Sequence, residues 1–277
     1  STLNLISEHY QANIKGIEAA EFPLIPEVKG EKRIEINAAD FKDAISKTVF
    51  ACALDETRPV LAGVYIKLVG KTVKMVATDS YRLAEKTINI SESNIKENED
   101  FIIPQRTLME IGRLIDESLE KVEIKIGDNQ VQFMLGPTQV VSRLIEGSFP
   151  DYEQIIPSKI KTNTILATSE FANAIKMASF FARESANNVK LVLKKPKNIQ
   201  VLAVSPQVGD NVSSLTADLE GEEIEIAFNA KFILDVLSVV GSEKVSIELV
   251  GSFSPGIIRP NKDKNYLYII MPLRTEE

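Results

Sequence analysis

The sequence predicts an α+β protein made of tandem domains, each an antiparallel sheet covered on one side by two helices. The first observation is an internal repeat, because residues 169–175 and 39–45 both contain an acid followed by Phe-x-x-Ala-Ile. The second is the pattern Glu-Lys-Val-x-Ile, found at residues 120–124 and again at 243–247. The offsets of 130 and 123 residues are too long for a solenoid of short repeats. Two layered α+β domains fit better.

The first complete unit alternates short apolar strands with two helices. Asn37 and Asp40 form an N-cap signal for the first helix. The apolar face of this helix is expected to consist of Phe41, Ile45, Val49 and Ala53. A second helix is expected over residues 105–115, with Pro104 in its first turn. The expected strands cover residues 34–36, 64–68, 73–77, 83–90, 101–103, 122–126, 131–135 and 140–144.

The chain on either side of this unit repeats parts of it. The unit closes with a proline-containing segment at residues 147–157, and the next unit has helices from residue 169 and over residues 230–240. Before the unit lie two short expected strands, residues 3–6 and 11–17, and a connector at residues 21–27 that resembles the closing segment. The N-terminal residues are therefore expected to be the last strands of an earlier unit whose beginning is absent.

Composition limits the class of protein. The 277 residues are 44% hydrophobic and carry a formal charge of −7, which argues against a protein that coats nucleic acid indiscriminately. A single cysteine, Cys52, excludes an internal disulfide and fits a reducing cytosol. The sequence has no 18-residue apolar run and no signal peptide at its N-terminus. These features predict a cytoplasmic protein.

No catalytic constellation emerges from the residues. The only histidine, His9, lies in the N-terminal stub, and Cys52 lies in an apolar stretch typical of a buried thiol. The sequence has no phosphate-binding loop, HExxH motif or zinc cysteine pair. Asp79 with Asp55 or Glu56 could hold a metal, but scattered acids are weak evidence. No cofactor or metal is predicted, and a binding protein is favoured.

A hairpin around residues 75–84 is the most informative local feature. Strand-like alternation runs up to Ala77, and the turn formers Asp79 and Ser80 follow. The tip gathers polar, aromatic, basic and apolar side chains. Two interpretations remain open: a packed turn in which Arg82 pairs with a carboxylate, or a binding surface.

Four motifs together resemble the bacterial DNA polymerase III β subunit, the sliding clamp family. They are residues 77–84 (Ala-Thr-Asp-Ser-Tyr-Arg-Leu-Ala), 142–152 (Ser-Arg-Leu-Ile-Glu-Gly-Ser-Phe-Pro-Asp-Tyr), 227–237 and 268–274 (Tyr-Ile-Ile-Met-Pro-Leu-Arg). Their order and spacing match the family over essentially the whole chain. The resemblance implies a DNA-clamp fold with a remnant of a first domain at residues 1–28, a second domain at 29–152 and a third at 153–277.

The resemblance also implies a function. A family member is a non-enzymatic processivity factor that encircles double-stranded DNA as a head-to-tail homodimer, with helices on the inner face and sheets outside. The cations expected to face DNA are Arg58, Arg106, Lys47 and Lys176. Phe180 and Phe181 match the apolar interface between chains, and adjacent positions on one helix cannot both be well buried. Because most of the first domain is absent, this chain is expected to be a monomer.

The family's partner site is a groove between the second and third domains. It accepts a short linear motif from the DNA polymerase III α subunit, the clamp loader, other polymerases and repair proteins. The residues that match the family's groove are Leu61, Thr78, Ser80, Tyr81, Arg82, Leu83, Pro150, Gln154, Ile155, Asn229, Phe232, Phe253, Ile269, Ile270, Met271, Pro272, Leu273 and Arg274. Many members have His where this chain has Tyr81, which bears on peptide preference. Two alternatives remain: a metal-dependent enzyme using Asp79 and Arg82, and a protein adaptor that never meets DNA.

Overall fold

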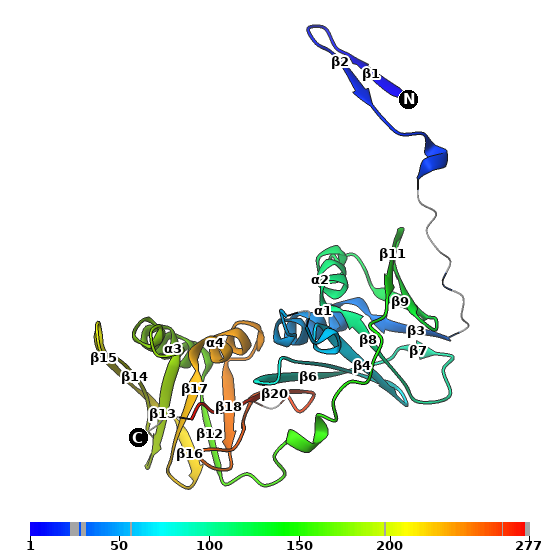
Figure 1. Cartoon of the computed structure of the whole chain (residues 1–277). Coiled ribbons are helices and arrows are strands. Elements are labelled where there is room, and N and C mark those ends of the chain that lie inside the picture. The colour runs from blue at the N-terminus through cyan, green and yellow to red at the C-terminus, as the bar shows by residue number, and fades with distance from the viewer. Residues whose placement is uncertain (23–27, 29–31, 56, 197, 262, 275–277) are drawn as a thin grey trace.

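Two lobes stand side by side in the computed structural model, which describes residues 1–22, 28, 32–55, 57–196, 198–261 and 263–274. The four α-helices among these residues lie in one row on one side of the lobes, and the sheets lie beneath them (Figure 1). The first lobe contains β3 (Lys32–Asn37), α1 (Ala38–Thr48), η2 (Val49–Ala51), η3 (Pro59–Leu61), β4 (Gly63–Val69), β5 (Thr72–Thr78), β6 (Arg82–Asn89), β7 (Glu92–Ser93), β8 (Glu99–Pro104), α2 (Gln105–Leu114), β9 (Lys121–Ile126), β10 (Gln130–Leu135) and β11 (Thr138–Arg143).

The second lobe repeats the same order of a strand, a helix, a group of strands and a second helix. After the connecting turn η4 (Glu153–Ile155) it contains β12 (Thr162–Ala167), α3 (Thr168–Ala182), β13 (Asn188–Lys194), β14 (Asn198–Ser205), β15 (Gly209–Thr216), β16 (Asp218–Gly221), β17 (Ile224–Asn229), α4 (Ala230–Val239), β18 (Lys244–Leu249), β19 (Gly256–Pro260) and β20 (Tyr266–Ile270). The predicted strands and both helices of the first unit are present, so the repeat identified real structural units.

Two details of the predicted helices are wrong. The Asn37 side chain caps α1 as expected, accepting a hydrogen bond from the Asp40 backbone N–H at 3.1 Å. The helix ends at Thr48, so Val49 lies in a 3-10 turn and Ala53 in the following loop. Thr48 Oγ1 donates to the Ala44 carbonyl at 2.7 Å, a back-bond that competes with regular helix geometry. Pro104 has extended backbone angles and precedes α2 as its cap.

The two lobes share one sheet, which the expectation of one sheet per unit did not include. Its nine strands have the order β16-β12-β18-β19-β20-β6-β5-β4-β8. The antiparallel pair β20–β6 joins the lobes and sets Ile269 opposite Leu83. Each lobe adds a separate sheet, β11-β10-β9-β3-β7 in the first and β15-β14-β13-β17 in the second. The last strand of the chain therefore lies beside the hairpin of the first lobe.

A small second core covers the far side of the shared sheet. The closing segment crosses this side, and its Phe149, Tyr152 and Ile156 pack on apolar side chains of the sheet. The Phe149 ring stacks on Tyr65 with centroids 4.8 Å apart. Since both faces of β6 are covered, by α1 on one side and this segment on the other, the hairpin is held firmly at the junction.

The N-terminal hairpin stands apart from the two lobes. Strands β1 (Thr2–Ile6) and β2 (Gln11–Lys15) pair as the sequence predicts, and a short turn η1 (Ala19–Glu21) follows. Every residue from 1 to 22 is exposed, and the hairpin lies away from the other elements (Figure 1). Most of the predicted connector, residues 23–27, lies outside the described residues. Within the described part of the chain, no helix has the length and apolar character needed to cross a membrane.

Candidate functional site

The hairpin tip between β5 and β6 is fixed by its own polar groups. Asp79 Oδ1 accepts hydrogen bonds from the backbone N–H groups of Tyr81 at 2.9 Å and Arg82 at 3.0 Å. Thr78 Oγ1 donates to the Arg82 carbonyl at 2.7 Å. Ser80 has a φ of 80°, which is unfavourable for a residue with a Cβ. Its Oγ accepts a hydrogen bond from Arg58 Nη1 at 2.9 Å.

Arg82 ties the two lobes together beneath this tip. Its side chain is 8% exposed, pairs with Asp79 through Nε at 2.9 Å, and pairs with Asp235 of α4 through Nη1. Nη2 donates to the Phe50 carbonyl at 2.8 Å, and the guanidinium lies 4.5 Å from the Phe232 ring centroid. The interpretation of a packed turn with a paired arginine is therefore confirmed. The Asp79 carboxylate is also engaged, and the described residues contain no group of three or more His, Cys, Asp or Glu placed to hold a metal.

A pocket of about 210 Å³ opens next to the tip, between the two lobes and the closing segment. Leu83 and Ile269 are neighbours across the β6–β20 pair, so they form an apolar floor made by both lobes. Pro150 and Ile155 of the closing segment and Met271 after β20 surround it. The complete lining is Leu61, Thr78, Ser80, Arg82, Leu83, Pro150, Asp151, Tyr152, Ile155, Ile269 and Met271. We call this pocket the junction groove.

Several residues predicted for the groove lie outside this lining. They are Tyr81, Gln154, Asn229, Phe232, Phe253, Ile270, Pro272, Leu273 and Arg274. Ile270 is completely buried in the main core, because side chains alternate along a strand and Ile269 takes the groove side. The prediction is wrong for Ile270.

The remaining residues of that set have other surroundings in the fold. Asn229 caps α4 by accepting from the Lys231 backbone N–H at 2.9 Å, and Phe232 lies under Arg82. The Tyr81 side chain is exposed at the rim, where its carbonyl accepts from the Met271 backbone N–H at 2.9 Å. Gln154 bonds to Asp151 on the surface of the closing segment, and Phe253 is largely exposed. These side chains therefore make other contacts or face solvent, and they do not line the pocket.

Two lining residues were missed by the sequence reasoning, Asp151 and Tyr152. Tyr152 is buried in the second core, and burial, helped by the nearby Glu85 carboxylate, raises the pKa of its phenol well above the usual value. The sequence contained a signal for both residues, because they are the last two residues of the 142–152 motif. Only the packing shows that Tyr152 faces the sheet and supports the groove from below.

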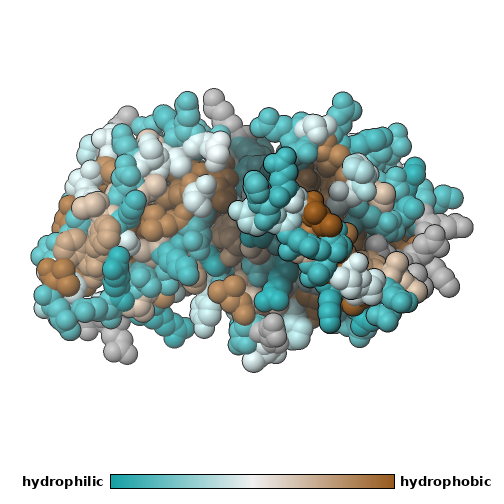
Figure 2. All heavy atoms as spheres, turned by 90° about the horizontal axis from the view of Figure 1, so that it is seen from above, coloured by the Kyte–Doolittle hydropathy of each residue, from teal (hydrophilic) through white to brown (hydrophobic). Residues whose placement is uncertain are grey.

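The predicted DNA-facing cations separate into two groups. Arg58, Arg106 and Lys176 are exposed. Lys47 is not available, because it is 8% exposed, bonds to Asp43 at 2.9 Å and lies 5.8 Å from the Tyr266 ring centroid. Figure 2 views the helix-bearing side from above, where most of the visible surface is hydrophilic and hydrophobic residues appear in scattered groups. Because Lys47 is buried and paired with Asp43, the prediction that it faces DNA is wrong.

The remaining predicted residues have clear surroundings. Phe181 packs partly against the main core while Phe180 is 47% exposed and contacts Arg183, so the helix does not bury both rings. Cys52 is buried, and burial raises the pKa of its thiol to about 12, which keeps it protonated and unreactive. His9 lies at the tip of the exposed N-terminal hairpin.

Comparisons with known proteins match both lobes. The sequence model for the central domain of the DNA polymerase III beta subunit matches residues 35–151, and that for its C-terminal domain matches residues 153–274. The beta sliding clamp of Bacillus subtilis is 36% identical over 267 residues, which is 95% of this chain and 70% of the relative. The chain belongs to the bacterial β sliding clamp family. The beta sliding clamp of Staphylococcus aureus is also similar, at 32% identity over 98% of this chain and 72% of the relative.

Solved structures of sliding clamps show the same fold. The Bacillus subtilis clamp matches with a TM-score of 0.92 at 34% identity, over 99% of this chain and 73% of that chain. The Thermotoga maritima β subunit matches with a TM-score of 0.91 at 28% identity, over 99% of this chain and 74% of that chain. The predicted clamp fold and the non-enzymatic clamp function are confirmed by this family membership, which also rejects the enzyme alternative.

Proposed function

We propose that the junction groove is the docking site of this clamp for a short linear peptide of its protein partners. The observation that supports this most is the apolar floor of Leu83 and Ile269, which two separate lobes build and hold open beside Met271. An isolated turn would leave no such concave apolar surface. Specific peptide sites of this kind are lined mainly by apolar side chains with a few placed polar groups.

The number of apolar side chains that a peptide can bury in the groove sets the expected affinity. Two leucine-sized anchors contribute roughly 1.5–3 kcal/mol each when buried. With a few backbone hydrogen bonds, and after the entropy of ordering the peptide, binding near micromolar is expected, or about −8 kcal/mol. The partners proposed for this site are the polymerase III α subunit, the clamp loader, and other polymerases and repair proteins.

Fluorescence anisotropy tests this proposal directly. A labelled peptide with a glutamine followed by paired Leu/Phe anchors is titrated with wild type, Met271→Asp and Val208→Asp. Met271 is 37% exposed at the groove and Val208 is 64% exposed in the second lobe, away from it, so neither change should unfold the chain. We expect saturable binding in wild type and Val208→Asp and a loss of at least tenfold in Met271→Asp. Equal binding by all three proteins would contradict the proposal.

We further propose that the row of helices faces duplex DNA in the closed ring. Arg106 at the start of α2 and Lys176 on α3 are exposed on this row. Contacts of this type go to phosphates, carry no sequence preference and weaken with salt. Binding of a labelled 20-base-pair duplex should therefore be weak, fall steeply between 50 and 200 mM salt, and fall further in the double variant Arg106→Glu and Lys176→Glu. Salt-independent binding would favour the adaptor alternative.

The surface that meets a second clamp chain is proposed at the outer end of the second lobe. There β15 is the edge strand of its sheet in the described part of the chain, and Phe180 and Met177 of α3 are about half exposed. An edge strand with nearby apolar side chains is suited to pairing with another chain. Light scattering is the check: this chain alone should stay monomeric, and a mixture with a full-length sliding clamp should form a larger complex, more weakly with Phe180→Asp.

A further inference from the structure

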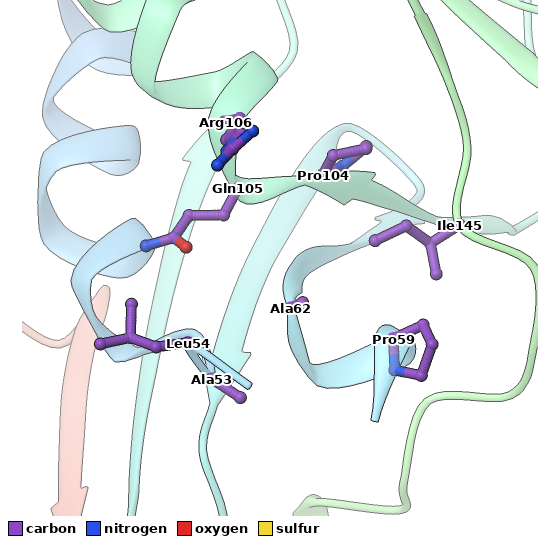
Figure 3. A pocket seen from close by; sticks show the side chains of 8 residues that line it. All are labelled: Ala53, Leu54, Pro59, Ala62, Pro104, Gln105, Arg106 and Ile145. Atoms are coloured by element: carbon purple, nitrogen blue, oxygen red, sulfur yellow. The ribbon is translucent and has the colours of Figure 1, made fainter. Parts of the chain in front are cut away.

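A second hollow lies beside the junction groove, on the other side of the turn η3. It has a volume of about 470 Å³ and lies between the loop after η2, the turn η3 and the start of α2. Figure 3 shows Pro59, Ala62 and Ile145 on one side of it and Leu54 and Gln105 on the other. Leu61 of the same turn lines the junction groove. The two hollows thus share η3 as a common wall, and we call the second one the side hollow.

The walls of the side hollow are held in place by backbone hydrogen bonds. The Ala53 N–H donates to the Leu61 carbonyl at 2.8 Å, and the Gln105 N–H donates to the Ala62 carbonyl at 3.1 Å. In the loop that follows Ala53, Asp55 accepts hydrogen bonds from the Thr57 N–H at 2.9 Å and from its hydroxyl at 2.7 Å. The two backbone bonds therefore set the positions of both walls of the side hollow.

The chemistry of the side hollow favours a protein over a nucleic acid. Six of its eight lining residues are apolar: Ala53, Leu54, Pro59, Ala62, Pro104 and Ile145. Leu54 is 85% exposed at its edge, a large apolar surface with no packing partner to explain it. One charged residue, Arg106, completes the lining, and it forms no ion pair within the described part of the chain. An apolar cavity with one free cation at its rim suits an apolar side chain followed by a carboxylate.

We propose that the side hollow is a second contact for the same protein partners, taking one leucine-like side chain and an adjacent acidic residue from the segment next to the groove-binding motif. The inference rests on the proposed function of the junction groove. The geometry permits a short link, because a three-residue 3-10 turn rises by roughly 6 Å and two or three extended residues span about 7–10 Å. Once the motif is docked, the second contact is made at high effective concentration.

The effect is measured with three labelled peptides. One is the short motif, and the other two carry Gly-Gly-Leu-Glu-Glu at the C-terminal end or its reverse at the N-terminal end. Burying one further apolar side chain, less the entropy of ordering it, is expected to tighten binding by roughly fivefold to tenfold for one of the two extensions. The gain should shrink below twofold in Leu54→Ser, while that variant binds the short peptide as wild type does.

Two controls separate the side hollow from general surface effects. Leu114→Ser removes another exposed leucine, 45% exposed at the end of α2, and should keep the gain. A Leu-Lys-Lys extension should lose most of the gain on wild type and recover it on Arg106→Glu, because the charges are then exchanged. Equal affinity of all three peptides for wild type, or a gain that survives Leu54→Ser, would overturn the proposal.

The failure of the groove itself has a different signature. If the short peptide does not bind wild type, the proposed docking function fails and the side hollow proposal falls with it. If the short peptide binds, neither extension helps, and Arg106→Glu weakens only duplex binding, then the side hollow belongs to the DNA-facing side and the partner assignment is wrong.

Discussion

Strand β6 in the first lobe and β15 in the second hold equivalent places in the repeat, yet they have opposite surroundings. α1 packs on β5 and β6, and α3 packs on β14 and β15 in the same way. β6 has β5 on one side and β20 on the other, and it is buried along most of its length. β15 ends its sheet in the described residues, and none of its residues is buried.

The difference shows that the segments packed around a strand, more than its position in the repeat, determine whether it lines a groove. Each of the two strands is the second strand of a hairpin. Only β6 has a further strand, β20, on its other edge and the closing segment across its face. The Asp79–Arg82 turn is tied to the second lobe, whereas the turn before β15 ends in Gly209 at a φ of 109° with open space around it. In the described part of the chain, the second lobe therefore keeps β15 as an uncovered edge strand.

The largest expected difference comes from the buried charge. Arg82→Met leaves Asp79 and Asp235 without their shared partner, which should lower the free energy of unfolding by about 3–5 kcal/mol. Chemical denaturation checks this, with Arg113→Met as the control, because the Arg113–Glu110 pair is exposed on α2 and such pairs contribute about 0–1 kcal/mol. A loss below about 1 kcal/mol for Arg82→Met would mean that the lobes do not depend on this contact.

The two strand environments can be compared with matched truncations. Ile269 is 1% exposed opposite β6, and Val212 of β15 is 54% exposed. Ile269→Ala should cost about 2–5 kcal/mol, while Val212→Ala should stay within about 0.5 kcal/mol. Thermal and urea unfolding give both values. Similar costs at the two positions would indicate that β15 is covered in solution.

The turns differ in how they tolerate a side chain. Gly209→Ala places a Cβ on a backbone with positive φ and should cost about 1–2 kcal/mol from strain alone. Ser80→Gly should relieve strain but lose the bond from Arg58, so its net effect should lie within about 1 kcal/mol. Ser80→Ala keeps the strain and loses the bond, and it should be the less stable of the two Ser80 variants by urea unfolding. The opposite order would rule out strain at Ser80.

The smallest expected effect is a pH dependence at the junction. Burial would raise the pKa of Asp263, but the Asn265 N–H and the Lys86 ammonium, 3.0 Å away, outweigh it and lower the pKa. A lowered carboxyl pKa gives stability that is present above the unfolded value, near 3.9, and is lost as pH falls through the folded value. Wild type should lose more stability than Asp263→Asn between pH 6 and pH 3, by under about 1 kcal/mol. Equal losses in wild type and Asp263→Asn would show that Asp263 contributes no such pH dependence.

Local sequence was sufficient for most elements, and half of the groove residues that the resemblance to the clamp family implied do line the groove. Alternating apolar residues predicted the strands, and Asn37 predicted the start of α1, because both signals act over a few residues. The family resemblance implied that Leu83, Pro150, Ile155, Ile269 and Met271 share one site, and the structure brings them together. The sequence could not show that the Lys47 amine lies over the Tyr266 ring or that Ile270 faces the main core, since both depend on where a distant strand lies.

The sequence by itself determined the repeat, the two α+β units, the turn at Asp79 and the family. The tertiary structure decided which hairpin lines the junction groove. That choice depends on the β20–β6 pair, on the Arg82–Asp235 contact and on Tyr152 of the closing segment packing under the floor. These contacts join residues far apart in the chain, and their free energy comes from burial and pairing that exist only once both lobes are folded.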